Sequence, residues 1–267
     1  MRQMLKYPGA KARLADWIIS YMPKHNVYVE PYAGSASILL SKARCHIETI
    51  NDIDGEIVNF FKILRDRPDE LIKKINLTPF ARDEYKNAFK HTGDEIERAR
   101  RYIVRCWQGF GCSQVYQNGF KSGQQSKSPN PAKAWAKLPH IMQEAVNRLK
   151  GVQIECLPAL ELLQRYNTPD VFIYADPPYY PGTRKGYLYK HEMTEQDHVE
   201  LLTALNKHPG MVMISGYDNE VYDQNLAGWR KIQKETQAEA GHKRTETLWM
   251  NYKSNQMTLI DWEITQN

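Results

Sequence analysis

The sequence predicts an α/β protein with a mostly parallel sheet, helices on both faces of that sheet, and a helical insertion. Short apolar runs alternate along the chain with helical patterns, and this alternation is typical of parallel sheets. The block from Pro68 to Arg148 breaks the alternation with helical patterns and one loop. At 267 residues, 42% hydrophobic and 25% charged, the chain fits one large domain or one domain with an insertion.

The predicted elements follow in order along the chain. Six short runs of apolar, β-branched or aromatic residues are strand candidates: Val27–Val29, Ile47–Ile50, Val152–Ile154, Val171–Tyr174, Met211–Ser215 and Leu248–Tyr252. Helical patterns lie between them: Ala12–Tyr21, Ser37–Ala43, Glu56–Leu64, Ala159–Tyr166 and Glu195–Leu205. Thr194 and Asp197 resemble a capping box that starts the last of these helices. Inside the insertion, the predicted helices are Asp83–His91, Asp94–Cys106 and Pro131–Arg148.

Composition and simple motifs exclude several classes of protein. The four cysteines show no Cys-x-x-Cys spacing, so the sequence indicates neither a zinc site nor a disulfide framework. The N-terminus has no apolar signal core, and no run approaches the ~18 apolar residues of a membrane span. We therefore expect a soluble, cytoplasmic protein without a membrane partner or a metal.

Positive charge is concentrated in one window. The chain carries a net charge of +5, and the stretch Arg98–Gln143 has eight Lys and Arg residues but no Asp or Glu. Six aromatic residues lie in the same window: Tyr102, Trp107, Phe110, Tyr116, Phe120 and Trp135. Nucleic acids need cations for phosphates and flat side chains for unstacked bases. A solvated basic face with core aromatics would have the same composition, so the window alone leaves both interpretations open.

Within this window, the stretch Ser113–Pro131 is rich in Gln, Gly, Ser, Asn and Pro. Such a segment cannot build an apolar core. We expect an exposed loop or hairpin, with Asn118-Gly119 as its turn.

The first candidate ligand site is a strand that runs into a turn of small residues at Glu30–Ser37. Small residues let a ligand approach the backbone at the start of the following helix. Asp52 follows Gly34 by 18 residues, at the end of the next predicted strand. A carboxylate at this offset can accept hydrogen bonds from both ribose hydroxyls of a nucleoside. Because the turn has only one glycine, an ordinary strand–helix turn would also fit it.

The second candidate site is Asp176-Pro177-Pro178-Tyr179, directly after the most apolar strand. The prolines cannot continue a strand ladder because they have no N–H to donate. The Asp176 carboxylate and the Pro177 carbonyl could together accept both N–H bonds of an adenine 6-amino group. The nitrogen lone pair would then face an electrophilic methyl carbon, and Tyr179 could stack on the base. A rigid strand-end turn would explain the prolines but not the flanking Asp and Tyr.

With these motifs, the chain resembles the Dam-like, S-adenosylmethionine-dependent DNA adenine methyltransferases over nearly its whole length. Asp176–Tyr179 matches their catalytic tetrapeptide residue for residue. Lys6–Lys11 is similar to their N-terminal Lys-Trp-x-Gly-Gly-Lys motif, with Tyr7 in place of Trp and Ala10 in place of Gly. Further similar segments are the methionine-binding turn Glu30–Gly34, the ribose-binding Asn51–Ile53, and the later strands Ser215–Tyr217 and Leu248–Tyr252. Ala36 replaces the second glycine of the turn, and Cys156–Pro158 lies where many relatives carry an acidic residue.

The resemblance implies a Rossmann-like, seven-stranded, mostly parallel methyltransferase sheet with an inserted helical target-recognition domain. Residues 1–59 and 151–267 would form the catalytic domain that binds S-adenosylmethionine. Residues 60–150 would form the helical, DNA-binding domain. The implied activity is site-specific methylation of the adenine 6-amino group in double-stranded DNA, with base flipping.

The resemblance also assigns candidate site residues. The catalytic candidates are Asp176, Pro177, Pro178 and Tyr179. The cofactor-binding candidates are Tyr7, Lys11, Glu30, Pro31, Tyr32, Gly34, Asp52, Ile53 and Asp176, with Lys11 facing the carboxylate of the cofactor and Glu30 its amino group. From the basic window, the DNA-binding candidates are Arg101, Arg105, Tyr116, Asn118, Phe120, Lys121 and Lys127. Tyr116 or Phe120 is the candidate wedge that fills the gap left by a flipped base.

Other functions remain open at this point. The same transfer could act on RNA, on a cytosine amine or on a glutamine side chain, and a DNA-binding protein of this fold could lack turnover. The intact Asp176–Tyr179 and Asp52 argue against loss of activity. We expect a bacterial or phage-encoded, nucleoid-associated enzyme that is a monomer or a homodimer.

Overall fold

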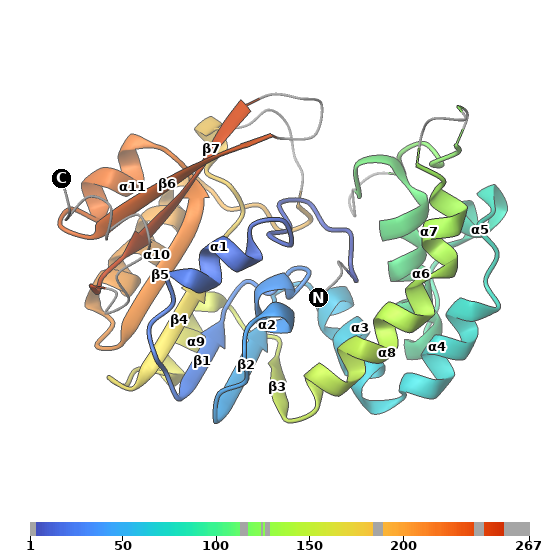
Figure 1. Cartoon of the computed structure of the whole chain (residues 1–267), viewed down its shortest axis with the longest axis horizontal. Coiled ribbons are helices and arrows are strands. Elements are labelled where there is room, and N and C mark those ends of the chain that lie inside the picture. The colour runs from blue at the N-terminus through green and yellow to red at the C-terminus, as the bar shows by residue number, and fades with distance from the viewer. Residues whose placement is uncertain are drawn as a thin grey trace, which may run out of the picture.

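The strands form one seven-stranded sheet in the order β3-β2-β1-β4-β5-β7-β6 (Figure 1). The computed structural model describes residues 4–112, 117–123, 125, 129–183, 189–237 and 243–253. The strands are β1 (Val27–Glu30), β2 (Ile47–Asn51), β3 (Val152–Glu155), β4 (Val171–Ala175), β5 (Met211–Tyr217), β6 (Arg230–Gln237) and β7 (Lys243–Met250). All strand pairs are parallel except those of β7 with β5 and β6. The predicted seven-stranded, mostly parallel sheet is confirmed.

The chain changes direction across the sheet between β1 and β4, which pair although they are far apart in sequence. From β1 it moves outward to β2 and β3, and from β4 it moves the other way to β5. In open α/β sheets, ligands bind at such a point, beyond the carboxyl ends of the strands. The segments that follow β1, β2 and β4 therefore meet where a ligand site is expected.

Helices cover both faces of the sheet because strand side chains alternate between two apolar cores. Phe172 and Tyr174 of β4 belong to the core shared with α1, α2, α3 and α8. Ile173, between them, belongs to the core shared with α9, α10 and α11. The bounds are α1 (Ala15–Ser20), α2 (Ser37–Ser41), α3 (Gly55–Asp66), α8 (Leu138–Leu149), α9 (Ala159–Arg165), α10 (Glu195–Lys207) and α11 (Glu220–Asn225).

The segment between β2 and β3 forms a helical lobe beside the β3 edge of the sheet (Figure 1). Besides α3 and α8, it contains α4 (Pro68–Asn76), α5 (Arg82–Asn87), α6 (Glu95–Gln108), a short 3-10 turn (Phe110–Cys112) and α7 (Pro131–Ala136). Its apolar side chains share one core with a face of the sheet. The boundary expected between residues 59 and 60 falls inside α3, so a separate recognition domain over residues 60–150 stays a prediction. Within the described ranges, no helix is long and apolar enough to cross a membrane.

Several elements differ from the sequence predictions. The edge strand β6 is mostly polar, so it has no apolar run by which it could be recognised. The helices α4 and α11 were also not among the predicted elements. The single helix predicted over Pro131–Arg148 is two helices, α7 and α8, with a break at Lys137. Pro139 lies in the first turn of α8 and has no N–H with which to continue a helix from α7.

The predicted Asn118-Gly119 turn is not formed. Gly109 pairs with Phe120, and the Phe110 N–H donates to the Gly119 carbonyl. Asn118 Nδ2 donates to the Phe110 carbonyl. Asn118 and Gly119 therefore belong to the returning segment of a longer loop, and their side-chain and backbone groups stabilise that return.

Candidate active site

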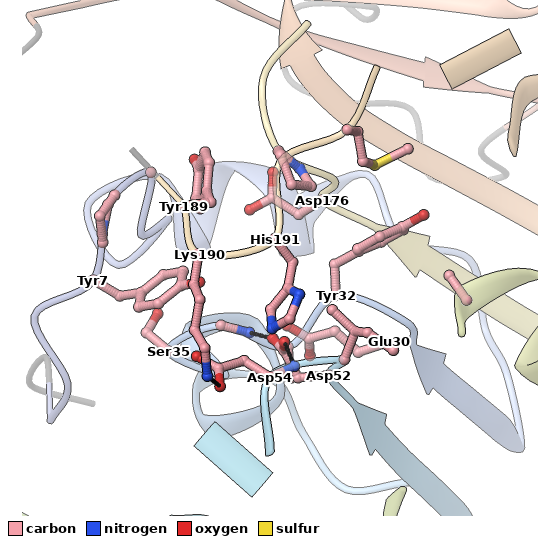
Figure 2. A pocket seen from close by; sticks show the side chains of 18 of the residues that line it. Tyr7, Glu30, Tyr32, Ser35, Asp52, Asp54, Asp176, Tyr189, Lys190 and His191 are labelled. Atoms are coloured by element: carbon pink, nitrogen blue, oxygen red, sulfur yellow. Dashed lines mark hydrogen bonds and ion pairs between the residues drawn. The ribbon is translucent and has the colours of Figure 1, made fainter. Parts of the chain in front are cut away.

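The segments that follow β1, β2 and β4 line one pocket of about 330 Å³ at the point where the strand order reverses (Figure 2). Glu30, Asp52 and Asp176 contribute carboxyl groups to its wall from three strand ends. The N-terminal segment Tyr7–Lys11 forms another part of the wall. The volume lies in the range of small-molecule sites, roughly 300–1,000 Å³. The fold thus brings together two motifs that are more than a hundred residues apart in sequence.

Asp52 is held in place by backbone N–H groups. Its Oδ2 accepts from the Gly34 N–H and its Oδ1 from the Asp54 N–H, both at 2.9 Å. Burial raises the pKa of Asp52 to about 6, although these two hydrogen bonds act in the opposite direction. A carboxylate offers about four acceptor positions, so this one retains capacity for hydroxyl donors.

The turn after β1 contains two residues with left-handed backbone conformations. Gly34 has a φ of +47°, and a Cβ at this position would lie 3.0 Å from the ring of Tyr7. Ala36, just before α2, has a φ of +49°. Alanine therefore adopts the conformation that the expected second glycine would favour, at a cost of about 1–2 kcal/mol.

Glu30 is buried at the end of β1. Its Oε2 accepts from the Tyr28 hydroxyl at 2.9 Å and from the Leu39 N–H at 3.2 Å. Burial raises the pKa of Glu30 to about 8, although the Tyr28 hydrogen bond acts against this rise. At neutral pH this carboxyl group is mostly protonated. A cationic group bound beside it would lower its pKa and favour the ionised form.

Asp176 presents one fixed oxygen and one oxygen that is open to a substrate. Its Oδ1 accepts from the Ser215 hydroxyl at 2.9 Å and lies 2.7 Å from the Lys11 ammonium. Among the residues that the structure describes, Oδ2 and the Pro177 carbonyl have no hydrogen-bond partner. The two acceptors that the sequence hypothesis requires are therefore both available to an amino group.

Lys11 is buried between two carboxylates. Its Nζ lies 2.7 Å from Asp176 Oδ1 and 3.3 Å from Glu246 Oε1, and it donates to the Tyr179 hydroxyl at 3.1 Å. Burial acts to lower the pKa of Lys11, but the carboxylates of Asp176 and Glu246 outweigh it and raise the pKa well above its ordinary value. The resemblance led us to expect Lys11 opposite the carboxylate of the cofactor. The structure places its ammonium against the protein's own carboxylates, and a contact with the cofactor stays a prediction.

Tyr179 is buried and stacked. Its ring lies parallel to that of Tyr217 on β5, with 4.0 Å between the centroids. The Lys11 ammonium lies 4.7 Å from the centroid of the Tyr179 ring. A base that stacks on the face of Tyr179 now covered by Tyr217 would have to displace Tyr217.

The segment Tyr189–Met193 forms a part of the wall that the sequence did not indicate. Lys190 Nζ lies 3.0 Å from Asp54 Oδ1, and Asp54 caps α3 by accepting from the Glu56 N–H. Through Lys190 the segment contacts Asp54, directly before the start of α3 (Figure 2). Its position shortly after the Asp176–Tyr179 tetrapeptide is the only sequence signal that could have identified it.

Pro158–Leu160 close the pocket beside Asp52. The Asn51 side chain fixes this segment: its Oδ1 accepts from the Leu157 N–H at 2.8 Å, and its Nδ2 donates to the Leu157 carbonyl at 3.0 Å. Hydrogen bonds between the Asn51 side chain and the Leu157 backbone thus hold the segment that leads into this wall. Of the predicted cofactor and catalytic residues, nine line the pocket: Tyr7, Lys11, Glu30, Tyr32, Gly34, Asp52, Ile53, Asp176 and Pro178. Pro31, Pro177 and Tyr179 are not among the lining residues.

The predicted DNA-binding arginines are engaged within the protein. Arg101 pairs with Glu97 at 2.8 Å and donates to the Lys90 carbonyl, and Arg105 donates to the Ala88 carbonyl at 2.7 Å. Both side chains are less than one-fifth exposed. These contacts hold α6 against the residues that end and follow α5. Either arginine would have to release them before it could bind a phosphate.

The other DNA-binding candidates lie in or near the loop after α6. Phe120 is half-buried against Phe80, with 5.1 Å between the ring centroids, and Asn118 bonds to the backbone. Lys121 is half-buried in the returning segment. Tyr116 and Lys127 lie outside the described residues. The structure therefore leaves the choice of wedge and phosphate contacts as predictions.

Comparison with known proteins identifies the family. The family described as D12 class N6 adenine-specific DNA methyltransferase matches residues 7–240. A type II methyltransferase, M.MjaIII of Methanocaldococcus jannaschii, is 25% identical over 82% of this chain and 85% of its own length. The DNA adenine methylase of Escherichia coli K12 is 24% identical over 94% of this chain and 95% of its own length. The chain belongs to the D12 class of N6 adenine-specific DNA methyltransferases, and its activity is methylation of adenine in DNA.

Proposed function

We propose that the pocket binds S-adenosylmethionine and that Asp176 acts on a flipped adenine of double-stranded DNA at its rim. The observation that supports this most is the convergence of Glu30, Asp52 and Asp176 on one pocket. The first two carry raised pKa values in this pocket, which is typical of functional sites.

The wall of the pocket fits the chemical groups of this cofactor. Asp52, fixed by two backbone donors, faces the pocket and suits the two ribose hydroxyls. The buried Glu30 suits the α-ammonium group, whose charge would favour its ionised form. Ile53 and the backbone-fixed Pro158 offer apolar surface beside Asp52 for a nucleobase. When bound, the cofactor supplies a methyl group on a positively charged sulfur atom.

At the other end, Asp176 prepares the amine for attack. Its free Oδ2 and the Pro177 carbonyl would accept the two N–H bonds of the adenine 6-amino group, so that its lone pair points at the methyl carbon. The amine nitrogen would form the new bond to the methyl carbon as the carbon–sulfur bond breaks and leaves its electron pair on sulfur, and the nitrogen would then give one proton to water. Because positive charge develops on nitrogen, the Asp176 carboxylate stabilises the transition state more than the ground state.

Base binding requires a local rearrangement in this account. Tyr217 covers one face of the Tyr179 ring, with the two rings parallel. The extruded adenine would displace Tyr217 and stack on Tyr179 in its place. Extrusion costs a few kcal/mol of unstacking, which the new stack and the phosphate contacts offset.

The cofactor assignment is tested by calorimetry with S-adenosylmethionine. Asp52→Ala removes hydrogen bonds to a charged group, worth roughly 1.5–3 kcal/mol each, so we expect the Kd to rise by at least about tenfold. Asp54→Ala is the matched control, because it removes a neighbouring carboxylate that is committed to Lys190 and the α3 cap. Unchanged affinity in the Asp52 variant, with weakened affinity in the Asp54 variant, would contradict the ribose assignment.

Base flipping is tested with a fluorescent adenine analogue at the target position. Asp176→Ala should still report an extruded base, whereas Tyr179→Ala should report less extrusion. Tyr217→Ala removes the side chain that competes for the Tyr179 ring, so we expect more extrusion than in the wild type. Equal signals in the two tyrosine variants would mean that the base does not stack on Tyr179.

A further inference from the structure

Glu246 is a buried carboxylate that no sequence motif marked. It lies on β7, is 2% exposed, and pairs in register with Tyr217 of β5. Its Oε1 lies 3.3 Å from the Lys11 ammonium, and its Oε2 accepts from the Tyr179 hydroxyl at 3.4 Å. Glu246 thus touches Tyr179, the last residue of the tetrapeptide, and Lys11, which contacts Asp176, without lining the pocket itself.

The fold alone gives no reason for a carboxylate at this position. Burying an ion pair costs desolvation that its attraction often does not repay, and apolar replacements are frequently neutral or stabilising. Burial raises the pKa of Glu246, while Lys11 beside it acts in the opposite direction. A buried carboxylate that carries this desolvation cost is expected where its charge has a functional role.

Its charge changes the balance around Asp176. Lys11 contacts two carboxylates, Asp176 at 2.7 Å and Glu246 at 3.3 Å. When both carboxylates are ionised, this cluster carries two negative charges and one positive charge, so its net charge is negative. Without Glu246, Lys11 would neutralise Asp176 alone, and the Asp176 carboxylate would be a weaker acceptor for an amine that becomes positive.

We propose that Glu246 is a positioning residue for methyl transfer, which shares Lys11 with Asp176 and orients the Tyr179 hydroxyl, so that Asp176 stays an anionic, fixed acceptor. This inference rests on the proposed function of Asp176. It adds to the reaction a side chain from β7, some seventy residues beyond the catalytic tetrapeptide in the sequence.

The test uses Glu246→Gln, which keeps the shape of the side chain and removes its charge. The rate is measured in a single turnover, with labelled S-adenosylmethionine and duplex DNA that contains the target adenine. Direct electrostatic donors contribute about 10²–10³-fold to rate, so a charge that acts through Lys11 should contribute less, about tenfold to a hundredfold. The Kd values for cofactor and DNA should stay within about threefold, because the effect belongs to the transition state.

Glu48→Gln is the matched control. Glu48 is also buried and pairs with a lysine, Lys42, at 2.7 Å, as well as with Arg148, but it lies on β2 outside the pocket. This variant should lower the melting temperature without slowing single-turnover transfer. Glu246→Asp keeps the charge, and it should recover at least about tenfold of the rate that Glu246→Gln loses.

A double-mutant cycle with Lys11→Met tests whether Glu246 acts through Lys11. In the Lys11→Met background, Glu246→Gln should slow transfer by less than about threefold, because the shared cation is gone. If the single Gln variant fails to fold, Lys11→Met is still compared with the double variant, which buries no unpaired carboxylate at position 246, and a loss above about threefold between these two would overturn the inference. An equal loss of rate in both backgrounds would overturn the inference.

Two further outcomes are distinguishable. A Glu246→Gln variant that transfers methyl at the wild-type rate, beside an inactive Asp176→Ala, would overturn the role of Glu246 and leave the proposed function intact. An active Asp176→Ala would overturn the proposed function itself.

Discussion

At the residue scale, the carboxyl groups of the pocket differ in the protons they hold. Burial raises the pKa of Glu30 to about 8 and that of Asp52 to about 6. At neutral pH, Glu30 is therefore mostly protonated and Asp52 mostly ionised in the ligand-free protein. Because the folded-state pKa of Glu30 lies above its ordinary value of 4.5, its contribution to the free energy of unfolding is lost as the pH rises from about 4.5 to about 8.

This protonation predicts that cofactor binding releases a proton. An ammonium group beside Glu30 favours its ionised form, so binding at pH 7 should release close to one proton from the wild-type protein. Titration calorimetry in two buffers with different ionisation enthalpies measures the number released. Glu30→Gln should release almost none and bind more weakly. Equal release by both proteins would mean that Glu30 does not face the ammonium group.

At the element scale, α6 shows why a basic composition does not by itself make a DNA-binding face. Arg98, Arg100 and Arg101 of this helix pair with Glu56, Glu84 and Glu97. Hydrogen bonds from Arg100 and then Arg101 lower the pKa of Glu97 to about 2. The positive charge of the helix is thus largely neutralised by acidic residues that precede the basic window in the sequence.

This arrangement predicts different roles for Arg101 and Lys121 in DNA binding. Lys121→Gln should flatten the slope of log affinity against log salt concentration by about one unit, because one phosphate contact is lost. Arg101→Gln should leave the slope unchanged and lower the melting temperature, because its partners are Glu97 and the Lys90 carbonyl. Fluorescence anisotropy over a salt series measures both slopes. A flattened slope in the Arg101 variant alone would place the DNA track on α6.

At the scale of the whole molecule, the helical lobe and the sheet are joined by a shared core and by buried charges. One apolar core extends from Phe60 and Tyr102 in the lobe to Tyr174 and Met250 in the sheet. Glu48 of β2 binds Arg148 of α8 at 2.6 Å. A lobe attached in this way is expected to unfold together with the sheet.

Thermal unfolding of the ligand-free protein should therefore be a single cooperative transition, with equal calorimetric and van't Hoff enthalpies. Arg148→Met should lower the melting temperature of that single transition, because it leaves the buried Glu48 with one partner fewer. Two separable transitions, of which the Arg148 substitution shifts only one, would show instead that the lobe folds as an independent domain.

The sequence predicts the sheet and the pocket walls well, because each depends on local signals. The apolar strands, the small-residue turn at Gly34 and the Asp176–Tyr179 tetrapeptide are all contiguous in the chain. The polar edge strand β6, the Lys190–Asp54 pair and the position of Glu246 depend on contacts between distant segments. Such contacts leave no periodicity or spacing in the sequence. The ion pairs of the α6 arginines could not be predicted either, because they too depend on how the chain folds.

The proposed function depends most on Asp176, whose carboxylate would prepare the adenine amine for methyl transfer. The most direct measurement is single-turnover transfer from labelled S-adenosylmethionine to adenine in duplex DNA, by the wild type and by Asp176→Ala. Asp170→Ala, an exposed carboxylate just before β4, serves as the control. We expect the rate of transfer to fall by at least about 10³-fold in Asp176→Ala, with cofactor and DNA affinities nearly unchanged. Transfer by Asp176→Ala within tenfold of the wild-type rate would contradict this role of Asp176.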